Sequence, residues 1–346
     1  MTDSQNGNEL KETGSFRKAM YDYLIMLGAL LISACFHYDI KALTLTALAA
    51  GTAAVTRKIG EKLTKTASHA PDFAAITAGA CCAMLLPATA PWWIAVFMGF
   101  FAAAVCIVPF GSAEGSPFVP AAAAVCFAVL CWSDKVFLYS DEGAMGLSSM
   151  LAQNNAVGRN SVAVLEVLSG SIPSAIGAGS IGIILGALVY LTLRRPSDSL
   201  AVYSFLFSVC LFAVLFPRVS TGRLMSVIME LCSGMLLFAA VFFISYPSVM
   251  PKRLFSKIIW GLFSGLVCML IRYFSPLEEA VCFGVLICGA CSDLFDRLPL
   301  LPIEKKRLEA AAAYIEIAPP IVPTEVLEEI PDVSPEAEEN GGGGDV

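Results

Sequence analysis

Long apolar runs alternate with short polar or basic connections along most of the chain. A helix that crosses the roughly 30 Å hydrocarbon core of a bilayer needs about 20 mainly apolar residues. The apolar runs predict helical spans at 21–36, 42–55, 73–87, 92–109, 118–138, 180–193, 200–216, 226–246, 257–274 and 280–295. We therefore expect an all-α fold, a polytopic membrane bundle of about ten helices, in which one or two of the shorter runs could be re-entrant.

The composition of the chain excludes a water-soluble globular fold. Hydrophobic residues make up 57% of the chain and charged residues 15%. A typical globular domain is about 45–50% apolar and about 25% charged, so this chain lacks the polar residues that would cover a water-soluble fold. Within the bundle, Gly182-xxx-Gly186 and Gly261-xxx-Gly265 predict places where two helix backbones pack closely.

Charge and polarity divide the chain into three parts. Residues 1–20 form a polar segment, residues 21–297 the membrane domain, and residues 298–346 an acidic tail whose composition is typical of disorder. The tail holds the excess negative charge, because eleven acidic residues lie from Glu304 onward while the net charge of the chain is −7. Inside the membrane domain, 133–179 is a long outside connection, and loops of that length are usually functional or disordered.

The distribution of lysine and arginine predicts the orientation. With the N-terminus in the cytoplasm, 16 of the 22 basic residues fall in inside segments. This bias follows the positive-inside rule, so both termini are expected to be cytoplasmic and the protein to lie in the cell (cytoplasmic) membrane. No basic stripe indicates a nucleic-acid partner.

The common catalytic and metal motifs are weak. Most of the twelve cysteines lie in apolar runs, where a free cysteine behaves as a small hydrophobic residue. Cys288-Gly-Ala-Cys291 has metal-like spacing but no second pair, so no metal site is predicted. The two histidines, His37 and His69, lack the context of a nucleophilic triad, and no phosphate-binding or dinucleotide motif occurs.

Carboxylates at membrane depth are costly and are functional candidates by default. Glu230 lies within the predicted span 226–246. Asp72 lies directly before the predicted span 73–87. Both are candidates for an ion path. The alternative for Glu230 is an interfacial residue on a helix that begins later than predicted.

The order of several landmarks is more specific than any one of them. They are Asp72-Phe-Ala-Ala, Leu85-Leu86-Pro87, Pro91-Trp92-Trp93, Ser116-Pro117-Phe118-Val119-Pro120-Ala121, Ser169-Gly170-Ser171-Ile172-Pro173 and Ser245-Tyr246-Pro247. In this order the sequence resembles the D-type subunit of Rnf-type electron transport complexes and the related B-type subunit of the sodium-translocating NADH:quinone reductase, over about residues 20–297. The resemblance implies a ten-helix flavoprotein scaffold that carries FMN, esterified to the Thr of an S-G-A-T-P motif, inside an ion-pumping translocase.

This chain departs from the family at the polar positions. The attachment Thr is replaced by Ile172, which has no oxygen for an ester, and Ser171 is one residue away. The motif N-x-F-N-P-A is replaced at Ser116, Phe118 and Pro120 by a version without either amide, and T-D-P is replaced by a version with Tyr246. The candidate cofactor-binding residues are thus Ser116, Phe118, Pro120 and 169–173, and FMN, if bound at all, is not expected to be covalent.

The expected function is a membrane subunit of an Rnf-like complex that couples electron transfer to Na⁺ or H⁺ movement. Whether the chain is itself an enzyme stays open, since it would act only with other membrane and redox subunits as partners. The alternatives are a flavin-free permease or channel and a purely structural scaffold subunit built on the same bundle.

Overall fold

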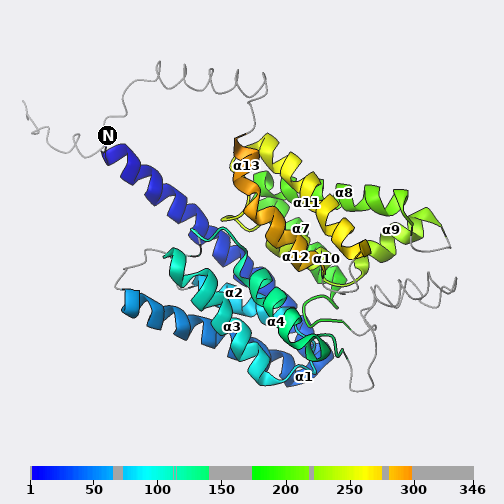
Figure 1. Cartoon of the computed structure of the whole chain (residues 1–346), viewed down its shortest axis with the longest axis horizontal. Coiled ribbons are helices and arrows are strands. Elements are labelled where there is room, and N and C mark those ends of the chain that lie inside the picture. Colours follow the sequence, from blue (N-terminus) through cyan, green and yellow to red (C-terminus); the bar gives the residue numbers. More distant parts are fainter. Residues whose placement is uncertain are drawn as a thin grey trace, which may run out of the picture. The chain divides into compact units, whose positions relative to one another are not determined.

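The computed structural model describes residues 2–64, 73–111, 113, 115–139, 174–217, 222–274 and 280–297, with side chains from residue 14 onward. These residues belong to one compact unit, Met1–Leu298, and they form helices with no strand among them (Figure 1). The predicted all-α membrane bundle is confirmed. The tail and most of the long connection 133–179 lie outside the described residues.

The first two predicted spans form a helical hairpin within α1 (Thr2–Thr64). The backbone leaves the helical region at Asp39, where φ is 55° and ψ is −152°. On α2 (Phe73–Met84), the Thr77 hydroxyl lies 3.5 Å from Met20 Sδ, and a Cβ on Gly79 would lie 2.5 Å from the carbonyl oxygen of Ala49. In a straight helix, the residues contacted at 20 and 49 would be about 44 Å apart, so the two arms of α1 must run side by side.

Prolines set the boundaries of the next helices. Pro87 and Pro91 flank the turn between α2 and α3 (Trp92–Cys106), and a short 3₁₀ turn, η1 (Val108–Phe110), follows. α4 (Pro120–Val136) begins with a proline at its first position, where the missing backbone N–H would have had no partner within the helix.

The second half of the chain repeats this mixture of long and broken helices. It contains α7 (Ile181–Arg194), α8 (Pro196–Leu215), α9 (Arg223–Cys232), α10 (Leu236–Ala239) continued by the π-helical turn η2 (Ala240–Ile244), α11 (Leu254–Phe274), α12 (Ala280–Ala290) and α13 (Ser292–Asp296). Each of the predicted spans coincides with a helix, a helix pair or one arm of α1.

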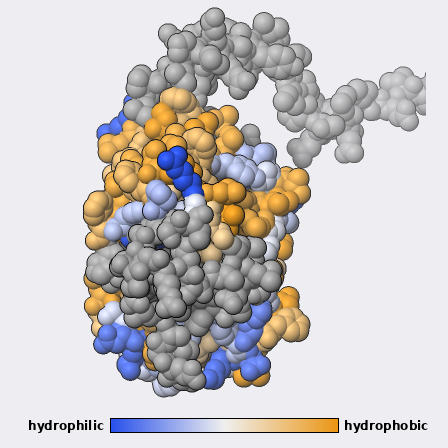
Figure 2. Space-filling model, turned by 90° about the vertical axis from the view of Figure 1, so that its right-hand side faces the viewer, coloured by the Kyte–Doolittle hydropathy of each residue, from blue (hydrophilic) through white to orange (hydrophobic). Residues whose placement is uncertain are grey.

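The surface of the described residues is that of a membrane protein. Apolar residues cover much of the face in Figure 2. Large apolar side chains such as Phe207, Leu193 and Trp92 are 62%, 79% and 65% exposed. Soluble monomers rarely expose a continuous apolar surface of this extent, whereas in a bilayer these side chains contact lipid.

The chain contains an internal repeat that the apolar pattern alone does not indicate. The segment Pro87–Pro91 precedes α3, and Pro247–Pro251 precedes α11, about 160 residues later. At nearly the same separation, Ser116-Pro117 precedes α4 and Ser275-Pro276 precedes α12. Corresponding elements are five predicted spans apart, which predicts that the two copies cross the membrane in opposite directions. Such an inversion predicts that the Ser116 segment of one copy and the Pro247 segment of the other lie at the same end of the bundle, and in the structure both segments approach Gly289 on α12.

The pair Gly261 and Gly265 packs α11 against α8, as predicted. A Cβ on Gly261 would collide with the Ser204 hydroxyl and would lie 2.5 Å from the carbonyl oxygen of Ala201. At Gly182 and Gly186 the prediction of close packing is wrong for the described residues, since no atom lies within 4 Å of a Cβ there.

This contrast gives a matched pair of variants. We expect Gly261→Ala to lower the free energy of unfolding by about 1–3 kcal/mol, because the helices must separate to admit the methyl group. Gly182→Ala should leave it unchanged or slightly higher, since alanine is the better helix former. Thermal unfolding of both purified variants in detergent measures the difference, and equal effects would contradict the packing.

Candidate functional site

The structure describes four of the sequence-predicted site residues, Ser116, Phe118, Pro120 and Glu230. The family attachment motif, 169–173, and Asp72 lie outside the described residues. The four described residues do not form one site. The first three lie at the start of α4, and Glu230 lies on α9 with contacts to a different part of the bundle.

The segment before α4 is held by its own hydrogen bonds. Ser116 is buried, and its hydroxyl donates to the carbonyl oxygen of Phe118 at 3.0 Å and accepts from the Phe118 N–H at 3.3 Å. Pro120 then starts the helix. Gly289 on α12 fixes the position of the segment, since a Cβ there would lie 2.7 Å from Val249 and 3.5 Å from the carbonyl oxygen of Pro117.

The end of the π turn lies opposite this segment. Tyr23 on α1 and Ser245 share a hydrogen bond of 2.6 Å between residues 222 positions apart, and Ser245 also donates to the carbonyl oxygen of Val241. Tyr246, at the position of the family carboxylate, packs with its ring centroid 6.1 Å from that of Tyr23. The Tyr246 hydroxyl is buried without a hydrogen-bond partner in the part of the chain that the structure describes.

The space between these two segments does not fit a flavin. The cavity lined by Pro120, Val119, Tyr23, Phe242 and Tyr246 has a volume of about 10 Å³, which is about the room that one water molecule needs. A site for a cofactor-sized ligand is typically 300–1,000 Å³. Aromatic side chains occupy the place where the sequence resemblance implied polar contacts to a cofactor, so we derive no redox step at this position.

Glu230 is part of a buried ion pair. Its carboxylate oxygen Oε2 lies 3.4 Å from Nε of Arg272 on α11, and the two side chains are 0% and 1% exposed. The Tyr273 hydroxyl lies 3.5 Å from the other carboxylate oxygen, Oε1. The alternative for Glu230 required a helix that begins later than predicted, and it is wrong in this respect, because α9 begins at Arg223.

Arg272 also stabilises a break in the helix that carries Glu230. The axes of α9 and the α10–η2 segment differ by 67°, with Ser233 in an extended conformation and Gly234 at a φ of 63°. Arg272 Nη2 donates to the carbonyl oxygen of Ser233 at 3.1 Å and also to its hydroxyl. The arginine thus caps the end of α9 and neutralises Glu230 at once, which favours a structural role for the pair over direct cation contact.

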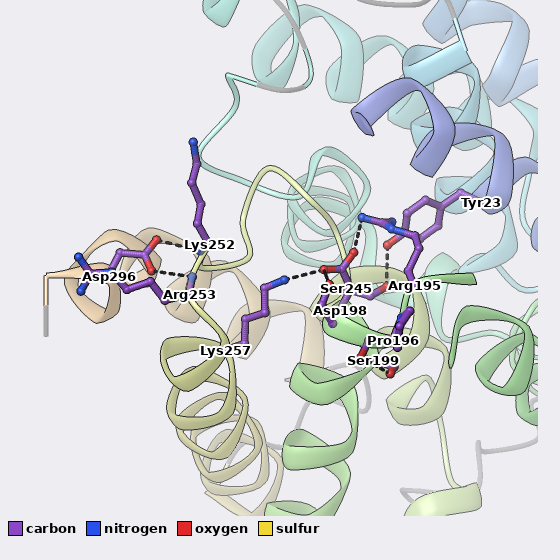
Figure 3. A network of polar contacts seen from close by, with 11 residues as sticks. Tyr23, Arg195, Pro196, Asp198, Ser199, Ser245, Lys252, Arg253, Lys257 and Asp296 are labelled. Atoms are coloured by element: carbon purple, nitrogen blue, oxygen red, sulfur yellow. Dashed lines mark hydrogen bonds and ion pairs between the residues drawn. The ribbon is translucent and has the colours of Figure 1, made fainter. Parts of the chain in front are cut away.

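A second buried charge cluster joins the α7–α8 junction to α11, and sequence reasoning did not single it out (Figure 3). Asp198 accepts from Lys257 Nζ at 2.6 Å and forms an ion pair with Arg195. All three side chains are largely or partly buried. The sequence signal for this cluster was the run Arg194-Arg195-Pro196-Ser197-Asp198. A proline at the first position of a helix and a carboxylate in its first turn are typical of a helix N-terminus.

The neighbouring Arg194 forms an ion pair with α1. Its guanidinium lies 3.2 Å from the buried carboxylate of Asp22 on α1, which also accepts from the Tyr190 hydroxyl at 3.0 Å. Arginine is charged at any physiological pH, so this contact is a full ion pair with Asp22. Among the described residues, no three His, Cys, Asp or Glu side chains are close enough to hold a metal ion.

Comparison with known proteins gives a consistent result over the whole membrane domain. Residues 6–300 match the profile of the NQR2, RnfD, RnfE family. The D subunit of the Na⁺-translocating ferredoxin:NAD⁺ oxidoreductase complex of Acetobacterium woodii is 24% identical over 286 residues, which cover 80% of this chain and 87% of that protein. The D subunit of the ion-translocating oxidoreductase complex of Salmonella paratyphi A is 26% identical over 72% of this chain and 83% of that protein. The corresponding protein of Stutzerimonas stutzeri is 27% identical over 66% and 74%.

Proposed function

The chain belongs to the NQR2, RnfD, RnfE family, and we propose that it is the D-type membrane subunit of an Rnf-like complex in the cytoplasmic membrane, where it takes part in electron transfer coupled to Na⁺ or H⁺ movement. One observation carries the proposal: the family match extends over residues 6–300, so it includes every described helix apart from the first four residues of α1. The relatives are named as subunits of complexes, which supports other membrane and redox subunits as partners.

The proposal includes a specific statement about the cofactor. FMN bound as a phosphoester needs a hydroxyl oxygen, and Ile172 supplies none. The filled space between Pro120 and Tyr246 supports the same conclusion for a noncovalent flavin at that place. The chain's own residues would then position its partners and keep the bundle closed to water, while redox groups of other subunits exchange the electrons.

We expect the intact mass of the protein, purified from its native host, to equal the mass of the unmodified chain. The reason is the missing hydroxyl at Ile172. Mass spectrometry of the wild type and of Ile172→Thr, which restores the family residue, makes the comparison. An FMN increment on the wild type would contradict the proposal and direct attention to Ser171. An increment on the Thr variant alone would show that the attachment machinery is present and that the isoleucine prevents its action.

The function itself is tested with the whole complex. The tagged chain, extracted with mild detergent, should copurify with redox subunits, and membrane vesicles without the chain should lose electron-transfer-driven uptake of Na⁺ or H⁺. Purification as a single chain that carries a solute flux in liposomes would instead indicate a permease or channel. The filled site at Tyr246 favours a scaffold role within the complex, in which case deletion prevents assembly while the redox subunits keep their individual activities.

A further inference from the structure

A polar cavity of about 620 Å³ opens beside the α7–α8 junction. One wall is formed by Arg194–Asp198, another by the loop Pro247–Lys252, and a third by Ser292, Asp293 and Asp296 around α13. This is the end of the bundle that the positive-inside rule assigns to the cytoplasm. The cavity is distinct from the filled space at Pro120, and its volume is within the range of small-molecule sites.

Two hydrogen-bond donors in these walls lack partners. Nη1 of Arg195 and the hydroxyl of Ser248 are both buried, and neither has a hydrogen-bond partner among the described residues. Leaving a buried donor unpaired is costly, most of all for a charged group. Both residues line the same cavity, so one ligand with several acceptor oxygens can satisfy both donors once the two side chains turn toward it.

The charges on this wall favour an anionic ligand. Asp198 is a single carboxylate between two cations, Arg195 and Lys257, and Asp198 and Lys257 are each 6% exposed. The cluster therefore has one positive charge more than it can neutralise internally. α8 also begins here, so its positive end faces the same region. Asp293 and Asp296 line the cavity on the α13 side. Their carboxylates repel an anion, so an anionic group is expected on the Arg195 side.

We propose that this cavity binds the phosphate group of a phosphate ester, with Arg195 and Ser248 as direct donors. Arginine with a neighbouring hydroxyl and ammonium is a donor set suited to phosphate oxygens. The cavity is much larger than an inorganic phosphate ion, so the ligand carries further groups. Its phosphate belongs either to a phospholipid headgroup at the membrane surface or to a soluble phosphate compound.

The experiment uses the full-length chain in detergent and separates the two sources. Native mass spectrometry with phosphatidylglycerol, and with diacylglycerol as the probe without phosphate, measures lipid binding. Thermal unfolding with inorganic phosphate, against chloride at equal ionic strength, measures binding of soluble phosphate. We expect a preference for the phosphate-bearing probe in at least one of these two measurements. The measurement that shows the preference identifies the source of the phosphate group.

The variants assign the binding to the cavity. Arg195→Gln should weaken binding by about tenfold or more, and Ser248→Ala by about three- to tenfold, since each removes a hydrogen bond to a charged acceptor. Arg253→Gln is the matched control, because it removes an equal charge from the same loop region but not from the cavity lining.

Two results would overturn the proposal. One is the absence of any preference for phosphate in both measurements, and the other is an equal loss of binding in Arg253→Gln and Arg195→Gln. If Arg195→Gln does not fold, Ser248→Ala decides, because its hydroxyl makes no hydrogen bond to the described residues that the fold would lose.

Discussion

Replacing Arg272 by methionine is expected to lower the free energy of unfolding by about 3–5 kcal/mol, because the substitution leaves the carboxylate of Glu230 buried without its counter-charge. Glu230 is 0% exposed, so water cannot replace the arginine without opening the bundle. The same substitution removes the hydrogen bonds from Arg272 to Ser233 that cap the broken end of α9. Equilibrium unfolding in mixed detergent micelles measures the loss.

The matched control is Arg223→Met. Arg223 begins α9, seven residues before Glu230, and is exposed, so its loss should change the free energy of unfolding by no more than about 0.5 kcal/mol. The double variant Glu230→Gln with Arg272→Met should recover part of the loss, because removing both charges leaves no unpaired ion. A loss of under about 1 kcal/mol in Arg272→Met would show that the pair is not buried as the structure has it.

The same variants test Glu230 as an ion-path residue. A cation at Glu230 would have to compete with the guanidinium of Arg272 3.4 Å away. If the pair is structural, Glu230→Gln lowers the stability of the complex but leaves the dependence of its activity on Na⁺ or H⁺ concentration unchanged. A shift in that dependence would instead restore Glu230 to the ion path.

The membrane fold could be predicted from the sequence because the bilayer imposes a strong local rule. Each span must be helical and mainly apolar, so the runs appear in the sequence wherever the helices are. The helical hairpin of α1 follows the same rule, since the polar group at Asp39 separates two apolar runs. The helix starts were predicted only approximately, since α4 begins at Pro120 and α8 at Pro196 while the predicted spans begin at 118 and 200.

The site was less predictable, because its contacts join residues far apart in the sequence. Tyr23 and Ser245 are 222 residues apart, and Asp198 and Lys257 are 59 apart. The apolar pattern predicts where each helix lies in the sequence, but it does not predict which other helix packs against it. The repeat of the Pro87–Pro91 segment at Pro247–Pro251 was the missing signal, since an inverted repeat predicts that the broken segments of the two copies meet.

Replacing Tyr246 by alanine is expected to lower the free energy of unfolding by about 3–5 kcal/mol, the usual cost of removing a large buried aromatic ring. Tyr246 is 6% exposed and packs against Tyr23 and Phe16, with ring centroids 6.1 and 6.5 Å away. Thermal unfolding in detergent measures the effect. Tyr203→Ala, at a side chain that is 44% exposed, is the control and should change stability by about 1 kcal/mol or less.

Two conservative variants separate the ring of Tyr246 from its hydroxyl. The Tyr246 hydroxyl is buried without a partner among the described residues, so Tyr246→Phe should equal or exceed the wild type in stability. The Tyr23 hydroxyl bonds to Ser245 at 2.6 Å, so Tyr23→Phe should lose about 1 kcal/mol. The reverse order of the two phenylalanine variants would contradict the hydrogen bonding at this site.

The cavity made by Tyr246→Ala also tests whether the site is closed to a flavin. An apolar cavity left by a large side chain binds small aromatic molecules of matching size. Phenol, which has the shape of the hydroxyphenyl group that the substitution removes, should therefore raise the unfolding temperature of Tyr246→Ala and not that of the wild type. Riboflavin is much larger than the space that one tyrosine vacates, and it should stabilise neither protein. Stabilisation of the wild type by riboflavin would contradict the proposal that the chain itself carries no flavin, and the chain would then be a candidate flavoprotein rather than a scaffold subunit.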